Sequence, residues 1–164
     1  MTRKLLTVAG LVLTLCATAA ADEKHGGLCF TLPEGWHSTL KKAVRTVNSP
    51  DEKITVTMTP VVADDVDAAF KALDKELADV VEDLDVTQVT RTTVNDLETV
   101  YFKGTTVSGE EPVRVTAAIV DAGDHCLIVV ATGSEESIEK YGKVMKGMFK
   151  SIRRPETEQV SDGR

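Results

Sequence analysis

Residues 53–82 read KITVTMTPVVADDVDAAFKALDKELADVVE, and two periodicities follow one another within this stretch. In residues 53–59 apolar side chains alternate with threonine, which predicts a half-buried strand that Pro60 either ends or marks as a sheet edge. Further on, apolar residues recur at gaps of four and three, which predicts a helix over about 65–82. The apolar positions of that helix are Val66, Phe70, Leu73, Leu77 and Val80. The change of period predicts a domain that combines strands with helices.

A second helix is predicted near the end of the chain. Ser134 is its expected N-cap, and Pro155 stops it. Lys146 and Lys150 lie toward its C-terminal end, where the helix dipole favours cations. The expected apolar stripe comprises Ile138, Tyr141, Met145, Met148 and Ile152. The apolar faces of both helices need a sheet to cover them. Asp64 or Asp65 is the expected N-cap of the first helix.

Short apolar or alternating segments predict the remaining strands. They are residues 28–32, 43–48, 86–93, 97–107, 113–121 and 125–132, with a bulge expected at Gly104. Tight turns link consecutive strands, so most pairs must be antiparallel. Residues 126–131 are apolar on both faces, which favours a central position. The predicted fold class is α+β: a twisted, mainly antiparallel sheet of about six to seven strands with two main helices packed on it.

The segment Phe30-Thr31-Leu32-Pro33-Glu34-Gly35-Trp36 resembles the opening of PsbP/Mog1/DcrB-like proteins, which are α/β/α sandwiches. The order of predicted elements over about 28–154 matches that family. The resemblance implies that Pro33, Gly35 and Trp36 form a structural turn with a core tryptophan. Its members include photosystem-associated subunits, a Ran-binding protein and bacterial envelope lipoproteins. It therefore implies a fold and a tendency to bind partners, and it implies no reaction.

Residues 1–21 have the pattern of a secretory signal peptide. Two basic residues precede an apolar run at 5–15, and small residues precede the expected cleavage site between Ala21 and Asp22. The apolar run is shorter than the span of about 20 residues that a membrane helix needs. We therefore expect a bacterial protein that is periplasmic or secreted, without a transmembrane anchor. Lipid anchoring at Cys16 is not favoured, because Leu15 stands where a lipoprotein signal has a small residue.

Behind the leader, we expect a flexible segment at 22–27, one globular domain at 28–154 and a disordered tail at 155–164. The chain has 19 Lys and Arg against 26 Asp and Glu, a net charge of −7. Removing residues 1–21 removes two cations and no acid, which leaves −9. This acidity argues against nucleic acid and anionic membrane surfaces as partners.

Cys29 and Cys126 remain after processing, on the first and last predicted strands. An even number of cysteines in an exported protein predicts a disulfide between them. The alternative is a pair of buried free thiols. No Cys-x-x-Cys spacing supports a redox role.

No catalytic, metal-binding or cofactor-binding constellation emerges from the sequence. The histidines His25, His37 and His125 lack metal-ligand spacing, and each is interpreted as structural. Trp36, Tyr101 and Phe102 could line a pocket, but we expect them to pack in the core.

The sequence thus favours an exported, non-enzymatic binding or accessory protein of the bacterial envelope. Its partner would be another envelope protein or a small ligand. One alternative is an envelope enzyme whose active-site residues are dispersed along the chain. Another is a structural or assembly component of an envelope complex.

Overall fold

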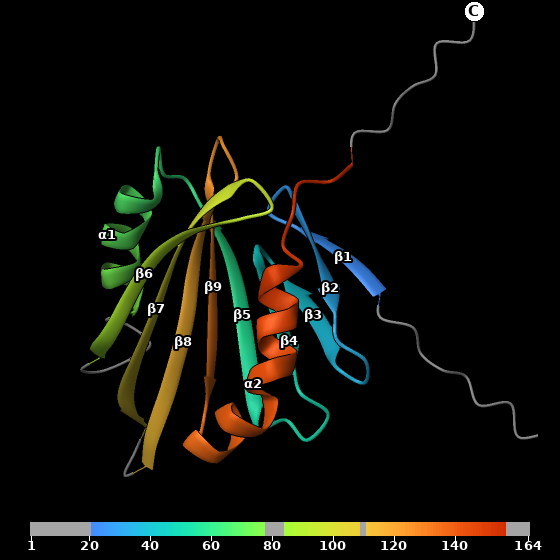
Figure 1. Ribbon diagram of the computed structural model, residues 1–164, viewed down its shortest axis with the longest axis vertical. Coiled ribbons are helices and arrows are strands. Elements are labelled where there is room, and N and C mark those ends of the chain that lie inside the picture. Colours follow the sequence, from blue (N-terminus) through green and yellow to red (C-terminus); the bar gives the residue numbers. More distant parts are fainter. Residues whose placement is uncertain (1–20, 78–83, 109–110, 157–164) are drawn as a thin grey trace, which may run out of the picture.

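The computed structural model describes residues 21–77, 84–108 and 111–156 (Figure 1). The strands are β1 (Ala21–His25), β2 (Leu28–Leu32), β3 (His37–Lys41), β4 (Val44–Asn48), β5 (Ile54–Val61), β6 (Asp85–Val94), β7 (Leu97–Ser108), β8 (Glu111–Asp121) and β9 (Cys126–Gly133). The helices are α1 (Val66–Leu77) and α2 (Glu135–Lys150). Predicted strands and helices are thus present, and two strands, β1 and β3, come in addition.

Seven strands form one antiparallel sheet in the order β3-β4-β5-β9-β8-β7-β6. The hairpin β1-β2 forms a separate two-stranded sheet. Helix α1 packs on one face of the large sheet, and α2 and the hairpin pack on the other (Figure 1). The predicted α+β class, with two helices on a mainly antiparallel sheet, is confirmed.

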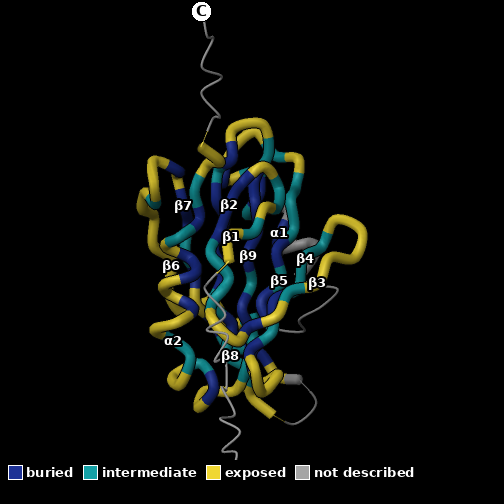
Figure 2. The backbone as a smooth tube through the Cα atoms, turned by 90° about the vertical axis from the view of Figure 1, so that its right-hand side faces the viewer, coloured by how far each residue is buried: buried dark blue, intermediate teal, exposed yellow. Residues whose placement is uncertain are grey.

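Two hydrophobic cores lie on opposite faces of the sheet, and the alternation along β9 serves both. Cys126 and Ile128 belong to the core under α1, whereas Leu127 and Val129 belong to the core under α2. Because successive strand residues point to opposite faces, a central strand covered on both sides is apolar throughout. Figure 2 shows the buried chain running through the middle of the molecule.

The described part of the first helix keeps the predicted face. Val66 and Leu73 are buried, and Phe70 packs against the same core. The Asp65 carboxylate accepts a hydrogen bond from the Ala68 amide at 2.7 Å, which caps the first turn. The predicted C-terminal part, including Val80, lies outside the described residues.

The turn at 33–36 places Trp36 in the core under α2. The Trp36 amide donates to the Pro33 carbonyl at 3.1 Å, and Gly35 has φ +75°, a left-handed conformation that favours glycine. The indole is buried and meets Tyr141 of α2 edge to face, with ring centroids 5.5 Å apart. This turn therefore fixes the loop to α2.

The prediction of a flexible segment at 22–27 is wrong. Residues 21–25 pair with β2 from Ala21↔Leu32 to His25↔Leu28. The Arg45 guanidinium donates to the Glu23 carboxylate, and it also donates to the Lys24 carbonyl at 3.2 Å. These contacts order a charged segment that carries no apolar pattern of its own.

The predicted disulfide is also absent: Cys29 and Cys126 are free and buried. Leu28 and Phe30 point into the core under α2, so Cys29 between them points away from the large sheet. Cys126 points into the core under α1, on the opposite face of that sheet. The sheet separates the two thiols. Burial raises the pKa of Cys126 to about 11, which keeps it protonated at neutral pH.

Gly104 stands beside a bulge, although the extra residue lies on the neighbouring strand. The register steps from Val86↔Gly104 to Gln88↔Lys103, which leaves Thr87 without an opposite residue. A Cβ at Gly104 would lie 2.7 Å from the Asp85 carbonyl oxygen, so glycine permits this close strand approach. A bulge bends the strand that carries it, and β6 is the edge strand of the large sheet.

Candidate ligand-binding groove

The two halves of the sheet face under α2 are covered differently. The hairpin β1-β2 packs over the half that contains β4 and β5, as shown by the bonds from Arg45 to Glu23 and from His25 to the Met58 carbonyl. At the other end of the sheet no second hairpin is seen among the described residues, and β6 is exposed along almost its whole length. The uncovered half leaves a hollow beside α2.

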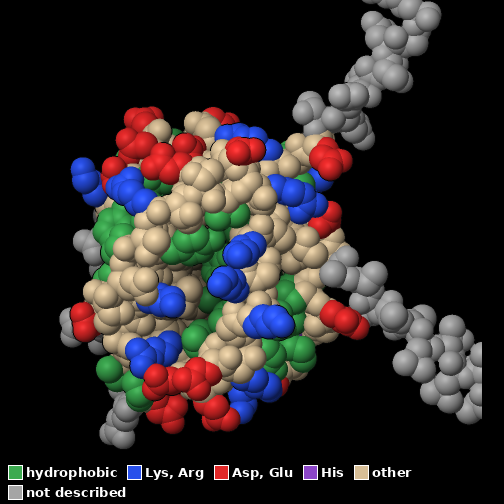
Figure 3. Space-filling view, viewed as in Figure 1, with side chains coloured by type: hydrophobic (Ala, Val, Ile, Leu, Met, Phe, Trp, Pro, Cys, Tyr) green, Lys and Arg blue, Asp and Glu red, His purple; other side chains and the backbone are tan. Residues whose placement is uncertain are grey.

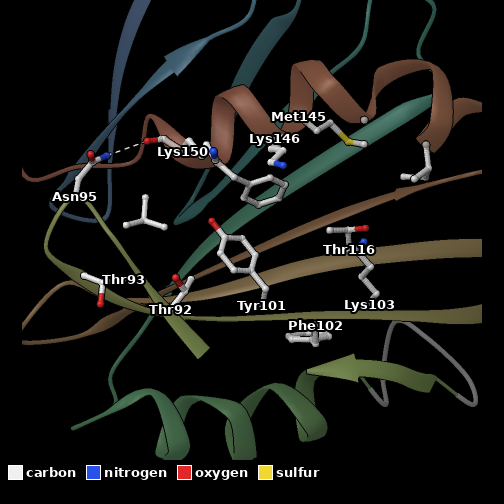
Figure 4. A pocket seen from close by; sticks show the side chains of 14 residues that line it. Thr92, Thr93, Asn95, Tyr101, Phe102, Lys103, Thr116, Met145, Lys146 and Lys150 are labelled. Carbon is white, nitrogen blue, oxygen red and sulfur yellow. Dashed lines mark hydrogen bonds between the residues drawn. The ribbon is translucent and has the colours of Figure 1, made fainter. Parts of the chain in front are cut away.

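This hollow is a groove of about 700 Å³ between α2 and strands β6, β7 and β8, which we call the α2 groove. It is lined by Thr92, Thr93, Val94, Asn95, Tyr101, Phe102, Lys103, Thr116, Ile138, Gly142, Met145, Lys146, Phe149 and Lys150 (Figure 4). Small-molecule sites in proteins commonly occupy about 300–1,000 Å³. The α2 groove therefore has the size of a ligand site.

The helix supplies an apolar wall. Ile138, Met145 and Phe149 lie on one side of α2 because they are spaced by seven and four residues. Gly142 lies between them, and a Cβ at this position would meet no atom within 4 Å. The missing side chain leaves open space along the helix where the groove runs.

Tyr101 of β7 forms part of the groove floor. Its ring packs edge to face against Phe149, with centroids 6.1 Å apart, and burial raises the pKa of its phenol. Within the described ranges, its hydroxyl has no hydrogen-bond partner, and Figure 4 shows the hydroxyl directed away from β7 into the space beneath α2. This group can donate to or accept from a ligand.

The turn between β6 and β7 closes one end of the groove. Asn95 has φ 48° and Asp96 has φ 63°, a pair of left-handed residues suited to a two-residue hairpin turn. The Asn95 amide nitrogen donates to the Lys150 carbonyl at 2.9 Å and to the Ile152 carbonyl at 2.8 Å. These bonds tie the uncovered strands to the end of α2.

Three lysines contribute the charge of the groove: Lys103 from β7 and Lys146 and Lys150 from α2. All three are exposed. Among the described residues none of them forms an ion pair, whereas Arg45, Arg91, Arg114, Lys140 and Arg153 do. Figure 3 shows cations around an apolar hollow, with acidic side chains mainly at the periphery of that face. The groove is a cationic site on an acidic protein.

The residues that the sequence singled out as site candidates lie outside the groove, with the exceptions of Tyr101 and Phe102. His25 and His125 fasten the hairpin, through the Met58 carbonyl at 2.9 Å and the Gly26 carbonyl at 2.7 Å. His37 begins β3 and is exposed. Within residues 21–77, 84–108 and 111–156, no group of three or more His, Cys, Asp or Glu side chains is arranged to hold a metal ion.

Of the three aromatic residues considered as pocket lining, Tyr101 and Phe102 line the groove, and Trp36 does not. The side chains of Trp36 and Phe102 are buried in the two cores. Sequence reasoning interpreted Lys146 and Lys150 only as dipole partners and did not connect Lys103 with them. The signal available was a Lys-Lys pair at a spacing of four beside the apolar pair Met145 and Phe149 at the same spacing.

Comparison with known proteins supports the fold and leaves the ligand open. No family model matches the chain, and no curated protein sequence matches it. The solution structure of cyanobacterial PsbP (CyanoP) from Synechocystis sp. PCC 6803 is similar with a TM-score of 0.66 at 9% identity, covering 92% of this chain and 99% of that one.

Two further solved structures are similar. LpqN of Mycobacterium tuberculosis, described as involved in cell envelope biogenesis, gives a TM-score of 0.58 at 10% identity over 85% of this chain and 88% of that one. PA94 of Pseudomonas aeruginosa, a protein of unknown function, gives a TM-score of 0.56 at 10% identity, covering 84% of this chain and 99% of that one. The chain thus has a PsbP-like α+β fold. Neither described helix is long and apolar enough to cross a membrane.

Proposed function

We propose that this chain is an exported, non-enzymatic binding protein of the bacterial envelope and that the α2 groove is its binding site. The observation that carries the proposal is the groove itself, which is lined by apolar, hydroxyl and lysine side chains on an otherwise acidic protein. Apolar walls hold a ligand by burial, and a few polar groups orient it.

Two further observations support the proposal. The sequence has a signal-peptide pattern over residues 1–21, which favours export. The similar structures include an envelope-biogenesis protein, LpqN, although at 10% identity this likeness concerns the fold.

Native mass spectrometry of the protein isolated from its own cells tests the groove as the binding site. We expect a non-covalent small molecule on the wild type that is lost in Gly142→Phe, because the added ring would extend from the open space at Gly142 into the groove. Gly147→Phe is the matched control: Gly147 is exposed on the same helix, has equally open surroundings and does not line the groove.

A small molecule retained by Gly142→Phe, or none on the wild type, would contradict the proposed site. Chemical conversion of the bound molecule on incubation would contradict a non-enzymatic role. Amino-terminal sequencing tests export separately: we expect the chain to start at Asp22 in the extracytoplasmic fraction. Full-length chain confined to the cytosol would contradict it.

A further inference from the structure

We propose that the ligand of the α2 groove is an anionic amphiphile, a phosphate or carboxylate group joined to an apolar chain, taken up as a free molecule. This inference rests on the proposed function, because it names the ligand class of the same site. It follows from the charge, the walls and the surroundings of the groove.

The charge of the lining selects an anion. Lys103, Lys146 and Lys150 are the charged members of the lining, and no Asp or Glu is among the described residues that form it. The chain as a whole carries a net charge of −7, so this cationic concavity runs against the general charge of the molecule. A concave surface with charge of one sign concentrates ligands of the opposite sign.

The lysines approach the groove from two elements. Lys146 and Lys150 are one helical turn apart on α2, where like charges repel each other. Lys103 comes from β7, opposite Thr116 of β8 in the sheet register. An anionic group in the groove would relieve the repulsion on α2 and meet a third cation across the groove.

The apolar walls of the groove favour a ligand that carries an apolar chain in addition to its anionic group. Val94, Tyr101 and Ile138 are half-buried and supply the apolar surface that the groove exposes, and the buried side chains of Met145 and Phe149 lie behind it. A bare phosphate would leave this surface in water, whereas an apolar chain would cover it. Methionine has a flexible side chain that adapts to ligand shape. The hydroxyls of Tyr101 and Thr116 can satisfy polar atoms where head group and chain join.

The surroundings favour a dissolved molecule over a lipid in a bilayer. Acidic side chains lie mainly at the periphery of the face that carries the groove (Figure 3). An anionic membrane surface would repel them before the groove could reach a head group. A single amphiphile can enter without bringing a charged surface with it.

Calorimetric titration tests the ligand class with decyl phosphate, decanol and inorganic phosphate as probes, using protein purified after expression of the full chain. We expect decyl phosphate to bind about tenfold more tightly than decanol and about a hundredfold more tightly than inorganic phosphate. The triple variant K103Q/K146Q/K150Q should bind decyl phosphate about tenfold more weakly. All three lysines are exposed, so the fold should persist.

The control K41Q/K53Q/K143Q removes the same charge from exposed lysines outside the lining and should change the affinity by less than about twofold. Decanol binding as tight as decyl phosphate, with no effect of the groove lysines, would overturn the anionic part. Inorganic phosphate binding equally tightly would overturn the apolar part. Co-sedimentation with phosphatidylglycerol vesicles would overturn uptake as a free molecule. None of these results removes the groove as a binding site, which is tested separately by the native ligand of the wild type and of Gly142→Phe.

Discussion

The two halves of the sheet face under α2 are built from the same kind of strand but are completed differently. Over β4 and β5 the hairpin β1-β2 inserts Leu28 and Phe30 into the core, and Arg45 holds Glu23. Over β6 and β7 the surface stays open, and the lysines beside it lack ion partners within the described ranges. One half is therefore sealed by an additional layer, whereas the other leaves apolar and charged surface open, where we propose that a ligand binds.

The largest effect should come from the closed half. Phe30→Ala removes a side chain that is 2% exposed and should lower the free energy of unfolding by about 3–5 kcal/mol, through lost burial and the cavity left behind. Thr92→Ala in the exposed strand β6 is the open-half counterpart, with an effect below about 0.5 kcal/mol. Urea denaturation measures both. Equal losses would contradict the division into two halves.

The ion pair that fastens the hairpin should give the next largest effect. Glu23→Gln leaves Arg45, whose side chain is 12% exposed, without its carboxylate and should cost about 1–3 kcal/mol. Arg114→Gln breaks the pair with Glu135, whose side chains are 42% and 65% exposed, and should cost less than about 1 kcal/mol. Thermal unfolding compares the two variants. The opposite order would show that the hairpin docks without its ion pair.

The sequence predicts a strand or helix of either half correctly where a local residue pattern specifies it, and misses it where contacts with distant residues do. The alternation in β5 and the helical spacing in α1 are local, so both elements are correctly predicted. The strand β1 reads Ala-Asp-Glu-Lys-His and has no apolar alternation, because its order comes from β2 and Arg45. The strand β3 is equally polar. Contacts made in three dimensions override weak local preference there.

Neither the groove nor the separation of the two thiols could be predicted without knowing how the helices and the sheet are layered. Lys103 and Lys146 lie far apart in the sequence, and only the packing of α2 over the sheet brings them to one site. The disulfide prediction failed for the same reason. Cysteine number favours a bond, but the opposite orientations of Cys29 and Cys126 become evident only once the sheet is seen between them.

A smaller effect concerns the pH dependence of stability and distinguishes His25, on the hairpin, from His125, which contacts the hairpin from the turn before β9. Burial lowers the pKa of His25 below 6.5, so its contribution to stability is present above 6.5 and is lost as pH falls through the folded-state pKa. The bond to the Gly26 carbonyl raises the pKa of His125, so its contribution is present below 6.5 and is lost as pH rises through the folded-state pKa.

We expect His25→Gln to flatten the loss of stability on the acidic side and His125→Gln to flatten the loss on the alkaline side. Melting temperatures measured from pH 5 to pH 8 check both signs. Identical pH profiles for the two variants would contradict the different environments of the two rings.

The smallest effect distinguishes stability from binding within α2. Gly142→Ala and Gly147→Ala should each raise the free energy of unfolding by about 0.5–1 kcal/mol, because alanine favours a helix and neither Cβ meets another atom within 4 Å. Their phenylalanine counterparts should differ in binding alone, with loss only at Gly142. Destabilisation by Gly142→Ala in denaturant unfolding would show that this position is packed and not open.

The most direct test of the groove as the binding site is a nitrogen-15 NMR titration of the protein with decyl phosphate. The account predicts that the largest shift changes fall on the amides of Tyr101, Lys103, Thr116, Gly142 and Lys146, while those of β1 and β2 stay in place. Changes centred on the hairpin, or no change at any of these positions, would contradict it.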